Sequence, residues 1–343
     1  MPVQPGMSRR HRWTPLGLAG LLLLASALVA TSVGAVAVVP GDVVKALWHG
    51  ATGQVDGVTD VIVWRIRFPR VLLAALVGGS LALAGVAYQG IFRNPLADPY
   101  LLGVASGASL GAAVALVFGG AVAWIGGFGV PAMSFLFALI AVGLVVAFAR
   151  QGSRVPVLSL ILAGVVIGST FTAATSFLML ASRDRAAGVL ARLLGSFGLA
   201  GWGEIVTVLP FLVLACIAIM VSGRALNLLQ LGDEQAAQLG LPVEKTKLLL
   251  IVLATLATAA AVSVSGIIGF VGLLVPHAVR LAVGPDHRMV TPLALLLGAT
   301  FMVLADLLAR TVIAPAEIPI GVVTALAGGP FFLWLLRRQR TLI

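Results

Sequence analysis

Long stretches without a charged side chain are the feature that most limits how this chain can fold. The segment from Pro99 to Ala149 carries no charge over its whole length, and only 10% of the 343 residues are charged, whereas 60% are hydrophobic. A soluble globular chain has about 25% charged residues, which help to cover its surface. Because so few charges cannot cover a water-exposed surface, we expect an integral membrane protein.

The uncharged stretches are long enough to cross a bilayer, which takes about 20 apolar residues per helix. Pro99–Ala149 has room for two helices, and Leu248–Val279 supplies two if the chain breaks near its glycines. The other stretches supply one helix each: Thr14–Gly41, Val71–Phe92, Val155–Ser182, Ile205–Gly223, Met289–Ala305 and Ile318–Leu336. Together they predict about eight to ten membrane-spanning helices.

Basic residues cluster at both ends of the chain. They are Arg9, Arg10 and Arg12 near the N-terminus and Arg337, Arg338 and Arg340 near the C-terminus. The positive-inside rule puts both groups in the cytoplasm, so the number of crossings is even. We therefore expect an all-α polytopic membrane protein of about ten transmembrane helices, with residues 1–343 forming one transmembrane domain.

The chain lacks the sequence signatures of a catalytic or cofactor site. It has no G-x-x-x-x-G-K-[ST] phosphate loop. Its single cysteine has no partner for a disulfide, and one cysteine with four histidines is too few for a structural zinc site. We therefore expect no catalytic residue, no metal and no bound cofactor. The net charge of +10 indicates basic loops beside anionic lipid rather than nucleic-acid binding.

Acidic residues are nearly absent from the predicted spans. Asp306 is the single acid inside one of them, and it lies one turn before Arg310, a spacing that favours a helical ion pair. A proton-coupled secondary transporter needs ionisable relays at mid-membrane, and a membrane-embedded enzyme needs a polar cluster there. Both classes are disfavoured, and the secondary transporter is kept as the alternative of a different class. Any uphill transport would then take its energy from a partner.

Two segments combine glycine and proline in informative patterns. The first, Asn94–Pro99, holds two prolines and predicts a sharp turn, with Asp98 starting the next helix. In that helix a stripe made of Gly103, Gly107 and Gly111 should let another backbone approach closely.

The second segment, Gly266–Arg280, has three glycines followed by Pro276 and His277. The spacing of Gly266, Gly269 and Gly272 predicts one smooth helix face. We interpret His277 as a hydrogen-bonded interface residue rather than a metal or haem ligand, because it has no companion histidine nearby.

With these segments the chain resembles the FecCD/BtuC family, the permease subunits of type II ABC importers for vitamin B12, haem and iron–siderophores. The matching segments, in order, are Arg65–Arg70, Asn94–Pro99, Leu102–Ala108, Gly232–Gly240, Gly269–Arg280 and Glu317–Thr324. The resemblance implies a BtuC-like homodimer of ten-span subunits in the bacterial inner membrane, with both termini cytoplasmic. It also implies two cytoplasmic ATPase subunits that hold ATP and Mg, and a periplasmic substrate-binding protein.

The resemblance assigns roles to three groups of residues. Arg67, Arg70 and Arg310 would dock the binding protein, since guanidinium groups suit carboxylates, with membrane-edge snorkelling as the alternative. Within residues 224–247, the coupling loop, the ATPase contacts would be Asp233, Glu234, Gln235, Ala236 and Gly240. The two acids at the start of that group also fit a simple interaction with a helix dipole. Asn94 and Leu96 would belong to the cytoplasmic gate.

The resemblance implies a permease that is not itself an enzyme. Its substrate would be a metal chelate, with haem as the best guess and an iron–siderophore or cobalamin as alternatives, because the binding protein supplies most of the selectivity.

Overall fold

The computed structural model describes residues 9–34, 36–119, 128–152, 154–182, 188–190 and 193–340. These residues form helices and connections, without a β-strand. The helices are α1 (Arg9–Ser32), α2 (Pro40–Thr52), α3 (Val58–Asp60), η1 (Val61–Arg67), α4 (Phe68–Phe92), η2 (Pro99–Leu102), α5 (Val104–Val117), α7 (Gly129–Ala149), α8 (Val157–Ala181), α10 (Trp202–Val221), α11 (Gly223–Gln230), α12 (Asp233–Gln238), α13 (Val243–Ser265), α14 (Val271–Val283), α15 (His287–Thr311) and α16 (Ile320–Arg340).

Seven helical runs in the described residues are long and apolar enough to cross a membrane. They lie in α1, in Val58–Phe92 (which ends in α4), and in α7, α8, α10, α13 and α15. Three shorter apolar helices, in α5, α14 and α16, bring the number of apolar helices in the described residues to ten. The predicted division of Pro99–Ala149 and of Leu248–Val279 into two helices each is confirmed. The chain is an all-α, multi-pass membrane protein.

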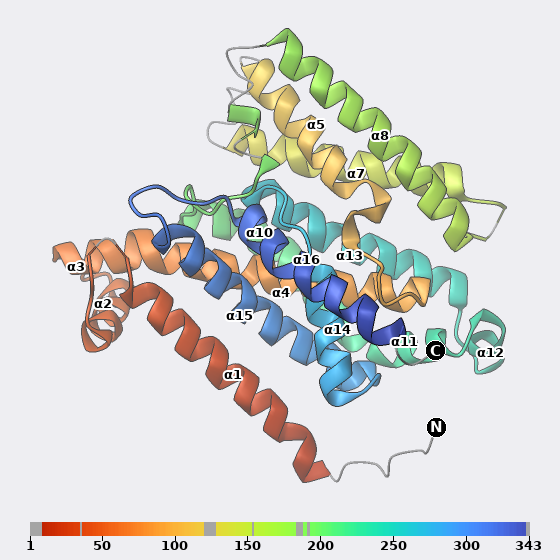
Figure 1. Cartoon of the computed structure of the whole chain (residues 1–343), viewed down its shortest axis with the longest axis horizontal. Helices are drawn as coiled ribbons and strands as arrows, with labels where there is room; N and C mark the ends of the chain where they lie inside the picture. The colour runs from red at the N-terminus through yellow and green to blue at the C-terminus, as the bar shows by residue number, and fades with distance from the viewer. Residues whose placement is uncertain are drawn as a thin grey trace.

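Helices α4 and α13 form the centre of the molecule. Most of each is buried, whereas less than a third of α1, α8 and α10 is buried. Helix α4 contacts α10, α13, α14 and α15, and α1 packs along α15. Helices α5, α7 and α8 form a second group, which meets the centre through α13 (Figure 1).

Glycines allow the neighbours of α4 to approach it closely. A Cβ at Gly78 would overlap the backbone of α15 at Gly298, and a Cβ at Gly85 would overlap the backbone of α14 at Gly272. In a bilayer, helices associate through such van der Waals contact, because surrounding lipid is as apolar as the helices themselves. The small residues of α4 therefore explain its central position.

The glycine stripe of α5 works in the same way for two of its three members. Gly107 lies against the backbone of α7 at Phe137, and Gly111 lies against it at Met133. This confirms the predicted close approach. Gly103 has a different role, because its φ of +78° places it in the left-handed region at the end of η2.

The prediction of one smooth helix face at Gly266, Gly269 and Gly272 is wrong. Gly266 ends α13 with a φ of +72°, and Phe270 has a φ of +68°, so the chain is not helical between α13 and α14. The Tyr100 hydroxyl donates to the Ile268 carbonyl at 3.0 Å and ties this break to η2. Irregular backbone inside a membrane protein is tolerated where protein covers it in this manner.

The two terminal helices run in opposite directions between the same two sides of the protein. Helix α1 ends, and α16 begins, beside the first turn of α4, at what we call the Arg70 rim. Their other ends therefore point toward the opposite side, where α4 ends and α11 and α12 lie; we call this side the α12 rim (Figure 1). Both terminal helices begin or end on the same side of the membrane, as an even number of crossings requires.

Candidate functional site

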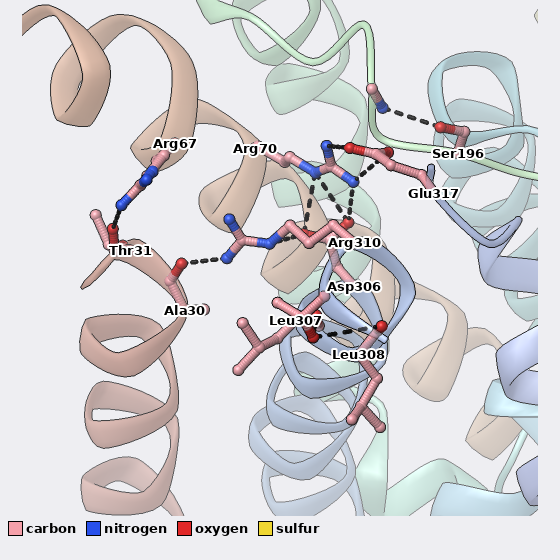
Figure 2. A network of polar contacts seen from close by, with 12 residues as sticks. Ala30, Thr31, Arg67, Arg70, Ser196, Asp306, Leu307, Leu308, Arg310 and Glu317 are labelled. Carbon is pink, nitrogen blue, oxygen red and sulfur yellow. Dashed lines mark hydrogen bonds and ion pairs between the residues drawn. The ribbon is translucent and has the colours of Figure 1, made fainter. Parts of the chain in front are cut away.

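Five charged residues from four segments meet at the Arg70 rim (Figure 2). Arg67 ends η1, and Arg70 lies in the first turn of α4. Asp306 and Arg310 are one turn apart in α15, and Glu317 lies in the connection between α15 and α16. We call these five residues the charged rim.

Arg70 is held on both sides by carboxylates. Its Nε and Nη2 donate to Asp306 Oδ1 at 3.0 and 2.9 Å. Its Nη1 and Nη2 donate to the two oxygens of Glu317 at 2.8 and 2.9 Å. The Asp306 side chain is 1% exposed, whereas the Glu317 side chain is 43% exposed. Glu317 is therefore the partner of Arg70 that solvent or another molecule can reach.

Arg67 and Arg310 bind the end of α1. Arg67 Nη1 donates to the carbonyls of Thr31 and Ser32 at 3.0 and 2.9 Å, and Arg310 Nη2 donates to the carbonyl of Ala30. The last carbonyls of a helix lack partners within it and carry a negative partial charge. The two guanidinium groups satisfy these carbonyls and join α1 to α4 and α15.

The predicted ion pair between Asp306 and Arg310 is confirmed, with 3.5 Å between Oδ2 and Nε. The sequence analysis did not predict that Arg70 and Glu317 join it. A signal existed, because a carboxylate buried in an apolar span requires positive partners. The hydrogen bonds from Arg70 are the main cause that lowers the pKa of Glu317, which lies outside the membrane-spanning helices.

The three arginines predicted to dock a binding protein are therefore engaged within the chain. Arg67 is 7% exposed and is directed toward α1, and Arg310 is mostly buried between Asp306 and α1. Arg65, one turn before Arg70, is exposed. The docking role of Arg67, Arg70 and Arg310 stays a prediction, and their observed contacts are structural.

A groove of about 520 Å³ lies between α5 and α8 and reaches the break between α13 and α14 at Ile267. None of the described residues that line it is charged. Seven of them carry hydroxyl groups: Tyr100, Ser106, Ser109, Ser169, Thr172, Thr175 and Ser176. The sequence analysis missed this groove, although hydroxyl residues recur at helical spacing along α8. An uncharged groove with scattered hydroxyl groups offers hydrogen bonds, but no counter-charge, to a molecule that enters it.

At the α12 rim, the structure brings the predicted gate turn and coupling segment together. Asn94 Oδ1 accepts a hydrogen bond from the Leu96 backbone at 2.9 Å, and both residues are exposed. Asp98 caps η2 as predicted, since its Oδ1 accepts from the Tyr100 backbone at 2.8 Å. The segment Asn94–Pro99 is therefore a turn, ordered by its own side chains.

The coupling segment contains the predicted short helix, α12, which Gly240 follows with a φ of +85°. Its members differ in exposure: Glu234 and Gln235 are exposed, whereas Ala236 is fully buried. Asp233 binds Lys247 and Arg93 within the chain. An outside partner can reach the exposed face of α12.

His277 differs from its predicted setting. It is 8% exposed, and neither of its ring nitrogens has a hydrogen-bond partner within the part of the chain that the structure describes.

Comparison with known proteins identifies the family. The sequence model of the FecCD transport family matches residues 22–338. The cobalamin import system permease protein BtuC of Halobacterium salinarum is 42% identical over 277 residues, which are 81% of this chain and 73% of that protein. The hemin transport system permease protein HmuU of Yersinia pestis is 39% identical over 335 residues, which are 95% of this chain and 96% of that protein.

A solved structure supports the same assignment. It is assigned to the metal-chelate type of ABC transporter, in an inward-facing conformation, and matches this fold with a TM-score of 0.84. The two sequences are 33% identical, and the match covers 95% of this chain and 99% of the other. The chain therefore belongs to the FecCD transport family of ABC transporter permeases.

Proposed function

We propose that this chain is the membrane-spanning permease subunit of an ABC importer that moves a metal chelate into the cytoplasm. Membership of the FecCD family supports the transporter class. The observation that favours an ATP-driven mechanism over a proton-coupled one is the pairing of Asp306. Among the described apolar helices, Asp306 is the one acidic residue that lies more than one turn from a helix end. Two arginines form ion pairs with it. Such a carboxylate is a poor proton relay, and this supports a partner ATPase as the source of energy.

Two ATPase subunits would bind at the α12 rim, on the cytoplasmic side. The basic N-terminal and C-terminal residues belong to helix ends on that side, in agreement with the positive-inside rule. The exposed face of α12, with Glu234 and Gln235, offers the ATPase a polar contact surface. ATP and Mg would be held by those subunits, and this chain would hold no cofactor.

A second copy of the chain would complete the pathway. The groove is bordered by α5 and α8, and the outer face of α8 exposes Leu158, Leu162 and Val166. A homodimer that covers this face would enclose the groove between two subunits. The protein would lie in the inner, cytoplasmic membrane of a bacterium.

The binding protein would dock on the Arg70 rim, which is then periplasmic. Arg70 is the arginine best suited to this role, because its partner Glu317 is half-exposed and an incoming carboxylate can take its place. Arg67 and Arg310 would support docking by holding α1 in position. Changing Arg70 to Gln should slow association of the binding protein, whereas changing Arg67 to Gln should chiefly lower stability. Equal, unchanged association for both folded variants would remove the docking role.

The groove and the relatives support a proposal for the substrate class. A neutral, hydroxyl-bearing lining offers no counter-charge, and relatives are named for hemin and for cobalamin. We propose a metal chelate, with haem first and a ferric siderophore or cobalamin as alternatives.

The direct test is uptake by the purified complex in liposomes. The permease, its ATPase and its binding protein are reconstituted, and each chelate is supplied with ATP or with a non-hydrolysable analogue. ATP-dependent uptake of one chelate supports the proposal and names the substrate. Uptake driven by a proton gradient without the ATPase, or ATP hydrolysis by this chain alone, would contradict it.

A further inference from the structure

The segment that leads into α12 is in close contact with the end of α4. Gln230, at the end of α11, donates from Nε2 to the carbonyl of Gly90 at 3.2 Å. The Leu226 side chain lies directly over the same glycine. The segment that precedes α12 is therefore fixed to the last turn of α4, from which the gate turn begins.

Asp233, the first residue of α12, joins three segments. Its Oδ2 accepts a hydrogen bond from Lys247 of α13, whose side chain is 5% exposed. Its Oδ1 is shielded from solvent and lies 3.6 Å from Arg93 Nη2. The carboxylate thus connects α12 to the centre of the protein on one side and to the end of α4 on the other.

Arg93 occupies an unusual backbone conformation. Its φ of +48° is one of two positive φ angles at non-glycine residues in the described ranges. This left-handed conformation is unfavourable for a residue with a side chain and persists where surrounding contacts hold it. Its guanidinium lies beside Gly232, which has a φ of +108°. The contact with Gly232 and Asp233 is one of those that hold Arg93.

The conformation of Arg93 sets the direction of the gate turn. Asn94 and Leu96 follow directly, and the turn is closed by hydrogen bonds from Leu96 to Asn94 Oδ1 and from the Ala97 backbone to the Asn94 carbonyl. A compact turn of this kind moves as a unit. A change of φ at Arg93 would therefore reorient the whole turn, including the exposed Leu96 side chain.

We propose that Asp233 is a positioning residue that transmits movement of α12 to the gate turn through Arg93. This inference rests on the proposed function, in which α12 contacts the ATPase and Leu96 belongs to the gate. It assigns Asp233 to an internal contact, and it leaves contact with the ATPase to the exposed neighbour Glu234. When the ATPase displaces α12, Asp233 separates from Arg93 and the gate turn is released.

The two neighbouring acids supply a matched pair of variants. Asp233→Asn keeps the size of the side chain but removes the charge from the pair, whereas Glu234→Gln removes a charge that makes no ion pair within the described residues. Arg93→Gln serves as a second variant, because it leaves the contact between Asp233 and Lys247 intact. It therefore remains informative if Asp233→Asn does not fold.

The first measurement uses the isolated permease in nanodiscs. A cysteine at Leu96, in a background in which Cys216 is replaced by Ala, reports exposure of the turn through its rate of reaction with a polar maleimide. We expect about a two- to fivefold faster reaction for Asp233→Asn and for Arg93→Gln, the range that an exposed ion pair can support. Glu234→Gln should leave the rate unchanged. The double variant Arg93→Gln/Asp233→Asn should match Asp233→Asn, because that change already removes the ion pair with Arg93.

The second measurement uses the complete complex with its ATPase and binding protein. Asp233→Asn should assemble with the ATPase as the wild type does and retain ATP hydrolysis, but transport less substrate per ATP. Glu234→Gln should weaken assembly. The proposal is overturned if Asp233→Asn and Arg93→Gln leave the Leu96 rate unchanged, if their effects add, or if Asp233→Asn weakens assembly instead. Failure of the wild-type permease to bind any ATPase would contradict the proposed function, and the labelling experiment would still test the internal contact.

Discussion

Replacement of Asp306 by Asn tests the charged rim without reference to function. The Asp306 side chain is 1% exposed and faces the guanidinium groups of Arg70 and Arg310 at 2.9 and 3.5 Å. Removing one partner of a buried ion pair costs about 3–5 kcal/mol, because the remaining charge stays buried without compensation. Arg70 keeps Glu317 and Arg310 keeps a carbonyl of α1, so we expect the lower end, about 3 kcal/mol.

The matched comparison is Glu317→Gln. Glu317 binds the same guanidinium, but its side chain is 43% exposed. A partly exposed pair contributes about 0–1 kcal/mol, so this variant should lose far less stability than Asp306→Asn. Unfolding of both variants in mixed micelles, titrated with SDS and followed by helical circular dichroism, gives the two free energies. If Asp306→Asn is as stable as the wild type, or if Glu317→Gln loses as much, the assignment of burial and partners is refuted.

Four further predictions address docking, pH, packing and topology. Glu317→Gln should raise the affinity of the binding protein by up to about fivefold, measured by biolayer interferometry, because it removes the carboxylate that competes for the rim; weaker binding would contradict competition. The pKa of Glu317 is lowered in the folded protein, so its contribution to stability is present above its ordinary pKa of about 4.5 and is lost as the pH falls through the folded value. The SDS midpoint should therefore fall more steeply below pH 4.5 in the wild type than in Glu317→Gln. Parallel curves for the two proteins would contradict this prediction. Gly85→Ala, which forces a Cβ into the backbone of α14, should cost at least about 1–3 kcal/mol in the same titration, whereas Gly143→Ala, with open space around it, should cost nothing comparable. In intact cells, an impermeant maleimide should label a cysteine at Lys45 and not one at Gln235; the reverse pattern would invert the membrane topology.

The helices could largely be predicted from the sequence because their signal is local. The absence of charge over about 20 residues indicates a span wherever it occurs, and Leu248–Val279 divided as the even number of crossings required. Two short-range motifs were also confirmed: Asp98 caps η2, and Gly107 and Gly111 allow α7 to approach closely. Each of these features depends on residues within one or two turns.

The prediction for Gly266, Gly269 and Gly272 was wrong for a physical reason. Periodicity describes a helix only if the chain is helical, and glycine is as compatible with a positive φ as with a helix. The choice between the two was made by a distant residue, since the Tyr100 hydroxyl binds the backbone at Ile268. A pattern within the segment does not contain that information.

The candidate site also combines features that the sequence predicts with features that depend on the packing of the helices. The sequence by itself determined that this is an all-α, multi-pass membrane protein of the FecCD family and that Asp306 requires a positive partner, because hydropathy and residue spacing are local properties of the chain. Only the tertiary structure decided that Arg70 lies between Asp306 and Glu317, that Arg67 and Arg310 bind α1, and that Asp233 is turned toward Arg93 while Glu234 is not. The partners in the charged rim are distant in sequence, whereas Asp233 and Glu234 are neighbours in one turn. In both cases the contacts depend on how the helices pack and rotate against one another. Charge and hydropathy along the chain do not specify that packing.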